Sequence, residues 1–171
     1  MRRYSALSVD LLLLLVVLFL AASTASAATL NVIGGQLFGA SGVIVDGSSY
    51  NVEFLDGTCI ALYDGCNDVS DFTFQTEAAA VLASQALLDQ VFVDSADLFD
   101  TDPTLTNGCT NAFVCGARTG YGFVFSDVSS AIARNEAVED NDVAATGAQS
   151  SPAVNSAVVP TRVWAVWSPV P

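Results

Sequence analysis

The chain has 171 residues, of which 18 are acidic, five are arginine and none is lysine or histidine. The formal net charge of −13 repels phosphate backbones and argues against nucleic acid as a partner. Without histidine, the chain cannot build a Ser-His-Asp or Cys-His catalytic apparatus, or a His-ligated zinc or haem site.

Residues 1–27 have the three-part layout of a secretory signal peptide. Two arginines stand in the first three residues, an unbroken apolar run covers residues 11–22, and an A-x-A pattern ends at Ala27. A membrane span needs about 20 apolar residues, so we expect cleavage near Ala27, with an uncleaved N-terminal anchor as the alternative. Residues 28–171 then form a single exported domain with three arginines and a net charge of −14.

The first part of the exported domain has the pattern of β-strands. Residues 29–38 predict a strand that two glycines interrupt, and residues 43–45 precede a strong turn signal at 46–49. Residues 50–54 alternate apolar and polar side chains with a period of two, which is typical of a half-buried strand. We expect its apolar members to face the core: Tyr50, Val52 and Phe54.

Residues 76–91 predict the main helix. Thr76 is suited to cap its N-terminus, and Glu77 lies favourably in the positive first turn. We expect this helix to cover one side of an antiparallel sheet. Its predicted inner face comprises Val81, Ser84, Leu87, Leu88, Val91 and Phe92.

After the helix we expect an acidic loop over residues 94–108, a strand at 121–125 and a short helix at 128–137. Residues 139–157 are small, polar and punctuated by Pro and Gly, and predict an exposed, flexible loop. Residues 162–167 are apolar on both faces and predict a central or covered strand. The predicted fold is α+β: a small antiparallel β-sheet with one main covering helix and two local disulfide loops.

All four cysteines lie in the exported part, and an even count there favours disulfides. We predict the local pairs Cys59–Cys66 and Cys109–Cys115, with bridges between the two loops as the alternative. The absence of C-x2-C spacing argues against a zinc site and against thiol redox catalysis.

Four aspartates on the acidic loop form the richest carboxylate cluster. Crowded hard oxygen ligands suit calcium, but the EF-hand pattern fails, because its sixth and twelfth positions are Phe99 and Leu105. The alternative is a solvated acidic surface. The candidate calcium ligands are Asp94, Asp97, Asp100 and Asp102, and a second acidic group comprises Glu139, Asp140 and Asp142.

The sequence assigns no catalytic or cofactor-binding residue. Paired carboxylates allow a hydrolase without histidine, but seventeen acids in the exported part make some pair inevitable. No nucleophile elbow, phosphate loop or dinucleotide fingerprint occurs. Five aromatic residues are candidates either for stacking on sugars or for packing in the core: Tyr50, Tyr63, Tyr121, Trp164 and Trp167.

Four different segments together resemble exported bacterial proteins of the PEP-CTERM sorting group. They are VDG…YNVEF…DGTC over residues 45–59, GC…DFTF over 65–74, ALLD at 86–89 and the tail VWAVWSPVP at 163–171. The resemblance implies a variable ectodomain, processing at the envelope, and an association with exopolysaccharide and biofilm. The Glu-Pro, apolar helix and basic tail of that group are missing here, as in a truncated relative or in a reading frame that is cut short, so its membrane anchoring is not carried over.

We therefore expect a non-enzymatic exported protein of the envelope or extracellular matrix, periplasmic or secreted, that engages in surface or biofilm-matrix interaction. One alternative is a carbohydrate- or calcium-binding module, and another is a histidine-independent hydrolase that uses paired carboxylates. The expected partners are glycans or envelope components. An anionic polymer as partner would require divalent cations to bridge the like charges, so its binding would depend on salt and cations.

Overall fold

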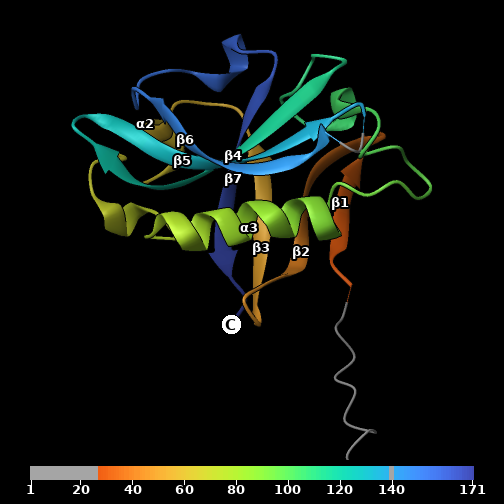
Figure 1. Ribbon diagram of the computed structural model, residues 1–171, viewed down its shortest axis with the longest axis horizontal. Helices are drawn as coiled ribbons and strands as arrows, with labels where there is room; N and C mark the ends of the chain where they lie inside the picture. Colours follow the sequence, from red (N-terminus) through yellow and green to blue (C-terminus); the bar gives the residue numbers. More distant parts are fainter. Residues whose placement is uncertain (1–26, 139–140) are drawn as a thin grey trace, which may run out of the picture.

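The computed structural model describes residues 27–138 and 141–171, so the predicted signal peptide lies outside the described residues except for Ala27. Seven strands form one sheet in the spatial order β1-β2-β3-β7-β4-β5-β6. Neighbouring strands are antiparallel except β4 and β7, which are parallel (Figure 1). The strands are β1 Thr29–Ile33, β2 Gln36–Val45, β3 Ser48–Leu55, β4 Val114–Val124, β5 Asp127–Glu136, β6 Val143–Ser150 and β7 Arg162–Pro169.

The main helix is α3, Glu77–Gln90, and it begins as predicted, with the Thr76 side chain accepting a hydrogen bond from the Ala79 N–H. It crosses one face of the sheet and contacts β2, β4, β5 and β6 (Figure 1). Within the described ranges, no helix has the length and apolar character that a membrane span requires. The short helical segments are α2 Cys59–Leu62, η1 Val69–Asp71, η2 Pro103–Leu105 and η4 Ser156–Val158.

The buried face of α3 agrees with the predicted one at Ser84 and Leu87, and Val91 and Phe92 just after the helix are buried as predicted. Val81 and Leu88 are only partly buried, and the fully buried positions are mostly small. Small side chains let the helix axis approach the sheet closely, which the larger apolar residues would prevent. The buried residues of α3 are Ala80, Ala83, Ser84, Ala86 and Leu87.

The first predicted strand is in fact a hairpin. Gly34 and Gly35 both have positive φ, at 61° and 84°, and form the two-residue turn between β1 and β2. The alternation predicted over residues 50–54 is confirmed in β3, where Val52 and Phe54 are buried and Glu53 is exposed.

Two predictions in the second half are wrong. Residues 128–137 are predicted as a short helix, but residues 128–136 lie in β5. This strand pairs with β4 on one side and β6 on the other, and pairing along both edges outweighs local helix propensity. Within 139–157, expected as an exposed loop, residues 143–150 form β6 and residues 156–158 form η4.

The sheet has a core on each face. The larger core lies between the sheet and α3, and Val163, Ala165 and Trp167 of β7 contribute to it. The smaller core lies on the opposite face, where Trp164 of the same strand packs with Phe72 and the first disulfide. The central position of β7 was predicted from its apolar residues on both faces and is confirmed.

Candidate functional site

The loop after α3 is folded around its own aspartates. Asp94 accepts hydrogen bonds from the backbone N–H groups of Asp100 and Thr101, at 2.9 and 3.2 Å, and from the Thr101 hydroxyl at 2.7 Å. Burial acts to raise the pKa of Asp94, but these hydrogen bonds lower it below its usual range. Asp102 caps η2 by accepting from the Thr104 N–H and hydroxyl.

The four predicted calcium ligands therefore have different surroundings. Asp94 and Asp102 hold backbone turns, Asp97 is half-buried, and Asp100 is 8% exposed. In the part of the chain that the structure describes, no three acidic or cysteine side chains are grouped so that they could hold a metal ion. Calcium binding at this loop stays a prediction.

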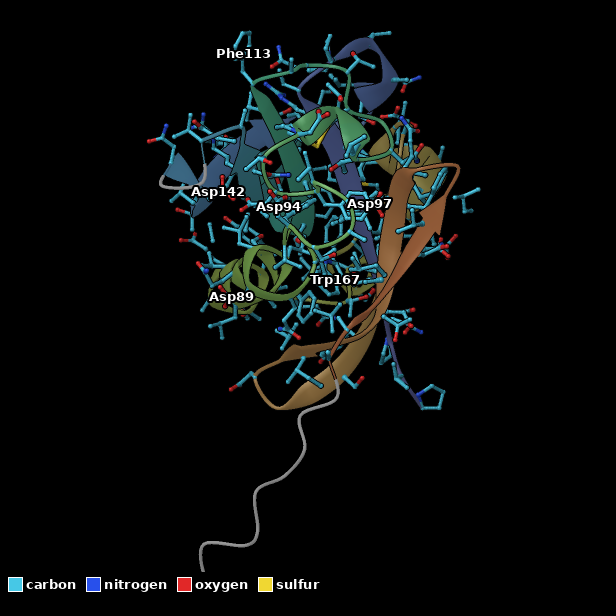
Figure 2. All side chains as sticks on the ribbon, turned by 90° about the vertical axis from the view of Figure 1, so that its right-hand side faces the viewer. Asp89, Asp94, Asp97, Phe113, Asp142 and Trp167 are labelled. Carbon is cyan, nitrogen blue, oxygen red and sulfur yellow. A yellow bond between two sulfur atoms is a disulfide. The ribbon has the colours of Figure 1, made fainter. Side chains whose placement is uncertain are left out.

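A hollow of about 410 Å³ lies at the C-terminal end of α3. Four acids line it, Asp89 from the helix, Asp94 and Asp100 from the loop, and Asp142 from the segment before β6, together with apolar residues of the helix end. Figure 2 faces this side of the molecule and labels Asp89, Asp94 and Asp142. Two predicted acidic groups thus meet here, although Glu139 and Asp140 lie outside the described residues.

The Asp100 and Asp142 carboxyl groups lie close enough to form a hydrogen bond with each other when one of them is protonated. Burial, and then the neighbouring carboxyl group, raise the pKa of Asp142 to about 6, and burial also raises the pKa of Asp100. Asp142 Oδ1 accepts a hydrogen bond from the Glu136 N–H at 2.6 Å, whereas Asp100 Oδ1 is buried without a partner. The two carboxyl groups can share one proton, because two adjacent negative charges repel each other.

This spacing limits the chemistry of the pair. Retaining glycosidases separate their two carboxyl groups by about 5–5.5 Å and inverting ones by about 6.5–9.5 Å, whereas Asp100 and Asp142 are close enough to share a hydrogen bond when one of them is protonated. What the arrangement can do is hold a proton and release it as the pH rises through the raised pKa of Asp142.

The two tryptophans are buried, with Trp164 2% and Trp167 6% exposed. Trp167 Nε1 donates to Thr119 Oγ1 at 3.0 Å, and its ring packs against Tyr50 and Phe74. Tyr63, half-buried, packs edge-on against Trp164. The tryptophans thus pack in the two cores and form no exposed platform for a sugar.

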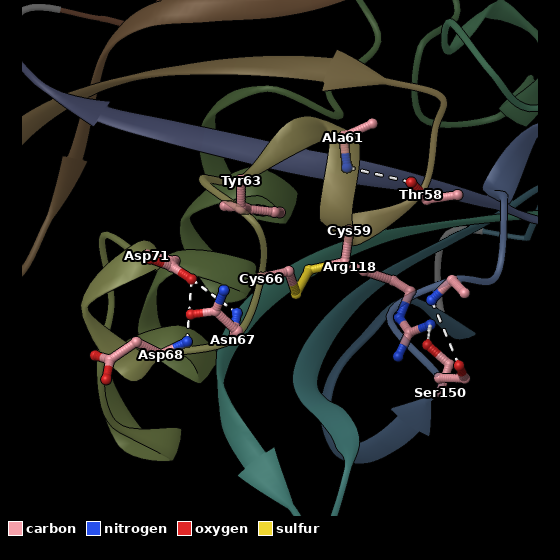
Figure 3. The surroundings of a disulfide bond; sticks show 12 residues. Thr58, Cys59, Ala61, Tyr63, Cys66, Asn67, Asp68, Asp71, Arg118 and Ser150 are labelled. Carbon is pink, nitrogen blue, oxygen red and sulfur yellow. Dashed lines mark hydrogen bonds between the residues drawn. A yellow bond between two sulfur atoms is a disulfide. The ribbon is translucent and has the colours of Figure 1, made fainter.

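Both predicted disulfides are confirmed, Cys59–Cys66 and Cys109–Cys115. The first joins the start of α2 to the loop before η1, and the Thr58 side chain caps that helix by accepting from the Ala61 N–H (Figure 3). Two disulfides indicate an oxidising compartment.

Arg118 lies near this disulfide, on the same face of the sheet (Figure 3). It is 3% exposed, lies 5.0 Å from the centre of the Trp164 ring, and donates to the hydroxyl groups of Ser130 and Ser150. Burial, and then the nearby charge of Arg162, lower the pKa of Arg118 to about 10.

The other two arginines of the exported part, Arg134 and Arg162, lie on the same face, in the row of cross-strand partners next to that of Arg118. Gly116 of β4 is paired with Arg134 on one side and with Arg162 on the other. The sequence signal for this cluster is weak, because the three positions are far apart in the chain and only the scarcity of arginine marks them.

No family model matches the sequence, and searches of curated proteins and of solved structures found no match.

Proposed function

We propose that this chain is an exported, non-enzymatic α+β domain of the cell envelope or extracellular matrix that binds its partner through one face of its sheet. The signal-peptide pattern and the resemblance to the PEP-CTERM sorting group support export. The two disulfides support residence in an oxidising compartment.

The observation that carries the binding role is the placement of positive charge. Residues 28–171 contain three arginines, and all three lie on the sheet face opposite α3, on the neighbouring strands β5, β4 and β7. Arg134 on β5 and Arg162 on β7 are both exposed, and β4, which carries the buried Arg118, lies between their strands. This gathering of positive charge on an otherwise acidic domain favours a negatively charged partner.

A retention assay tests this role. The protein is produced by export from its full sequence, mixed with envelope and extracellular matrix fractions of the organism that makes it, and sedimented at increasing salt. We expect retention at low ionic strength, release at high ionic strength, and loss of retention in Arg162→Gln. Gln36→Glu is the matched control, because it lowers the net charge equally at an exposed position of β2, at the other side of the sheet. Absence of retention at low ionic strength, or equal effects of the two variants, would contradict the role.

A second candidate is a histidine-independent hydrolase, favoured by the Asp100–Asp142 pair at the acidic hollow. Aspartic proteases use two carboxyl groups that share one proton. Screening the exported protein against peptide and glycan substrates at mildly acidic pH tests this candidate. Turnover that disappears in Asp142→Asn, but persists in the exposed-site control Asp46→Asn, would establish it and displace the binding role.

A further inference from the structure

Arg134 and Arg162 lie on either side of Gly116 in one row across three strands. Cross-strand partners present their side chains on the same face of a sheet. The alternate residues Ala117 and Val163 belong to the core under α3, so the arginine row is on the opposite face. Since neighbouring strands are about 4.8 Å apart, the Cα atoms of the two arginines are separated by about 10 Å.

The row is hollowed at Gly116. Its small cavity, about 160 Å³, is lined by both arginines and by Val114, Gly116, Ile132 and Thr161. A Cβ atom at position 116 would lie 3.1 Å from Ile132 Cγ2 and 3.3 Å from the Thr161 carbonyl oxygen. The floor of the hollow is therefore open because this residue has no side chain. The lining combines two cationic ends with apolar walls.

The two guanidinium groups differ in their partners. Arg134 forms an ion pair with Glu136 at 2.5 Å. Arg162 is exposed and, within residues 27–138 and 141–171, forms no ion pair. Its charge is nevertheless strong enough at Arg118 to contribute, after burial, to lowering the pKa of that residue. This face is thus a local concentration of positive charge on an otherwise acidic domain.

A carboxylate matches this chemistry. Guanidinium groups bind carboxylates through charged, often paired hydrogen bonds. Val114 and Ile132 offer contact to the carbon atoms that carry the carboxylate. The net charge of −14 on residues 28–171 and the nearby Glu136 disfavour a ligand with several negative charges. The hollow is also smaller than sites for drug-sized ligands, which begin at about 300 Å³, so it suits one ring-sized unit.

We propose that the hollow between Arg134 and Arg162 binds a single carboxylate group carried on a compact organic unit. The uronic acid of a glycan and a free ring-bearing carboxylic acid share this chemistry. The assignment rests on the proposed binding role of the sheet face and gives that role a ligand class. Carboxylate binding in the hollow requires no calcium, unlike cation-bridged binding, and it weakens as salt screens the charges.

The test observes the arginine side chains directly by NMR, through their Nε–Hε groups in the ¹⁵N-labelled exported protein. Residues 28–171 contain three arginines, so single substitutions assign every signal. The probes are glucuronate, benzoate and, as a neutral control, glucose. We expect glucuronate, in the presence of a chelator, to shift the Arg134 and Arg162 signals saturably while the buried Arg118 signal stays in place. A response to glucuronate alone indicates a glycan uronate, and a response to both acids indicates any ring-bearing carboxylate.

Two variants and one control separate the hollow from the overall charge. Arg162→Gln removes one guanidinium group, and Gly116→Ala places a methyl group on the floor. We expect Arg162→Gln to weaken glucuronate binding by about tenfold to a hundredfold, the range for loss of a charged hydrogen bond. We expect Gly116→Ala to weaken it too, because the added methyl group occupies the floor of the hollow. Gln36→Glu lowers the net charge as much as Arg162→Gln does, and we expect it to change the affinity less than about twofold. Because Arg162 is exposed, its variant keeps the test valid even if the tightly packed alanine disturbs the fold.

The assignment is overturned by equal shifts with glucose, by shifts that rise linearly without saturation, by no shift, or by equal weakening in Arg162→Gln and Gln36→Glu. Failure of the hollow and failure of the proposed function are distinguishable. Matrix retention without carboxylate binding overturns the hollow and leaves the function standing. Carboxylate binding without retention keeps the hollow and overturns the function.

Discussion

The carboxyl pair makes the stability of this protein depend on pH in a defined direction. The pKa of Asp142 is raised to about 6, chiefly by burial, whereas an aspartate in an unfolded chain titrates near about 3.9. The folded state therefore keeps a proton that the unfolded state releases between these two values. The stabilisation is fully present below about pH 4 and is lost as the pH rises through about 6. The pKa of Asp94 is lowered, so this residue stabilises the fold when it is ionised, and its contribution is lost only in more acidic solution.

The magnitude follows from the shift and from exposure. One pKa unit corresponds to about 1.4 kcal/mol, so the shift sets a ceiling of about 3 kcal/mol. Asp142 is only partly buried, so solvent screening reduces the expected effect to about 1 kcal/mol. Asp142→Asn mimics the protonated group, since its amide oxygen can still accept from the Glu136 N–H and its NH₂ can donate to Asp100. We expect this variant to be more stable than the wild type by about 1 kcal/mol at about pH 7.5, and equal to it near pH 4.

Urea unfolding followed by tryptophan fluorescence at a series of pH values measures this difference. Asp46→Asn is the matched control. Asp46 is exposed in the turn after β2 and has a φ of 47°, a conformation that asparagine adopts readily. It should keep the wild-type pH dependence. If the wild type becomes more stable between about pH 5 and about pH 7.5, or if Asp142→Asn keeps the full wild-type slope, the shared-proton reasoning is refuted.

Replacing Cys59 and Cys66 together by alanine should lower the free energy of unfolding by about 2–3 kcal/mol, because the bridge closes only a short loop; unchanged urea stability would contradict this. Trp164 and Trp167 are buried, so we expect blue-shifted emission that neutral sugars leave unchanged, and a spectral shift with a neutral sugar would argue for an exposed platform. A calcium titration of the melting temperature tests the predicted site on the 94–102 loop, because an ion that binds only the native state raises the melting temperature; an unchanged melting temperature would contradict the prediction.

The sequence predicted correctly the elements that depend on residues close together in the chain. The helix over residues 76–91 has its own cap and a long uninterrupted run of helix formers, and α3 matches it closely. The strand at 50–54 shows the period of a sheet with one face buried, and the two cysteine pairs are close in sequence. The helix predicted over residues 128–137 is wrong, because pairing with strands on both sides makes residues 128–136 part of β5.

In the candidate sites too, features within one segment were predictable, whereas contacts between distant segments were not. The aspartates of the acidic loop are recognisable by their crowding, but the carboxyl group that lies next to Asp100 belongs to Asp142, from a segment predicted as a separate loop. The arginine row was not recognisable at all, because the register of β5, β4 and β7 alone brings Arg134 and Arg162 to the two sides of Gly116.

By itself, the sequence determined the acidic character, the absence of histidine chemistry, the signal-peptide pattern, the main helix and the local disulfides, because each depends on composition or on neighbouring residues. Only the tertiary structure decided that both tryptophans are buried, that four acids from separate segments line one hollow, and that the three arginines of the exported part gather on one face. These features depend on strand order and register, which are set by long-range backbone pairing and by burial of a common core.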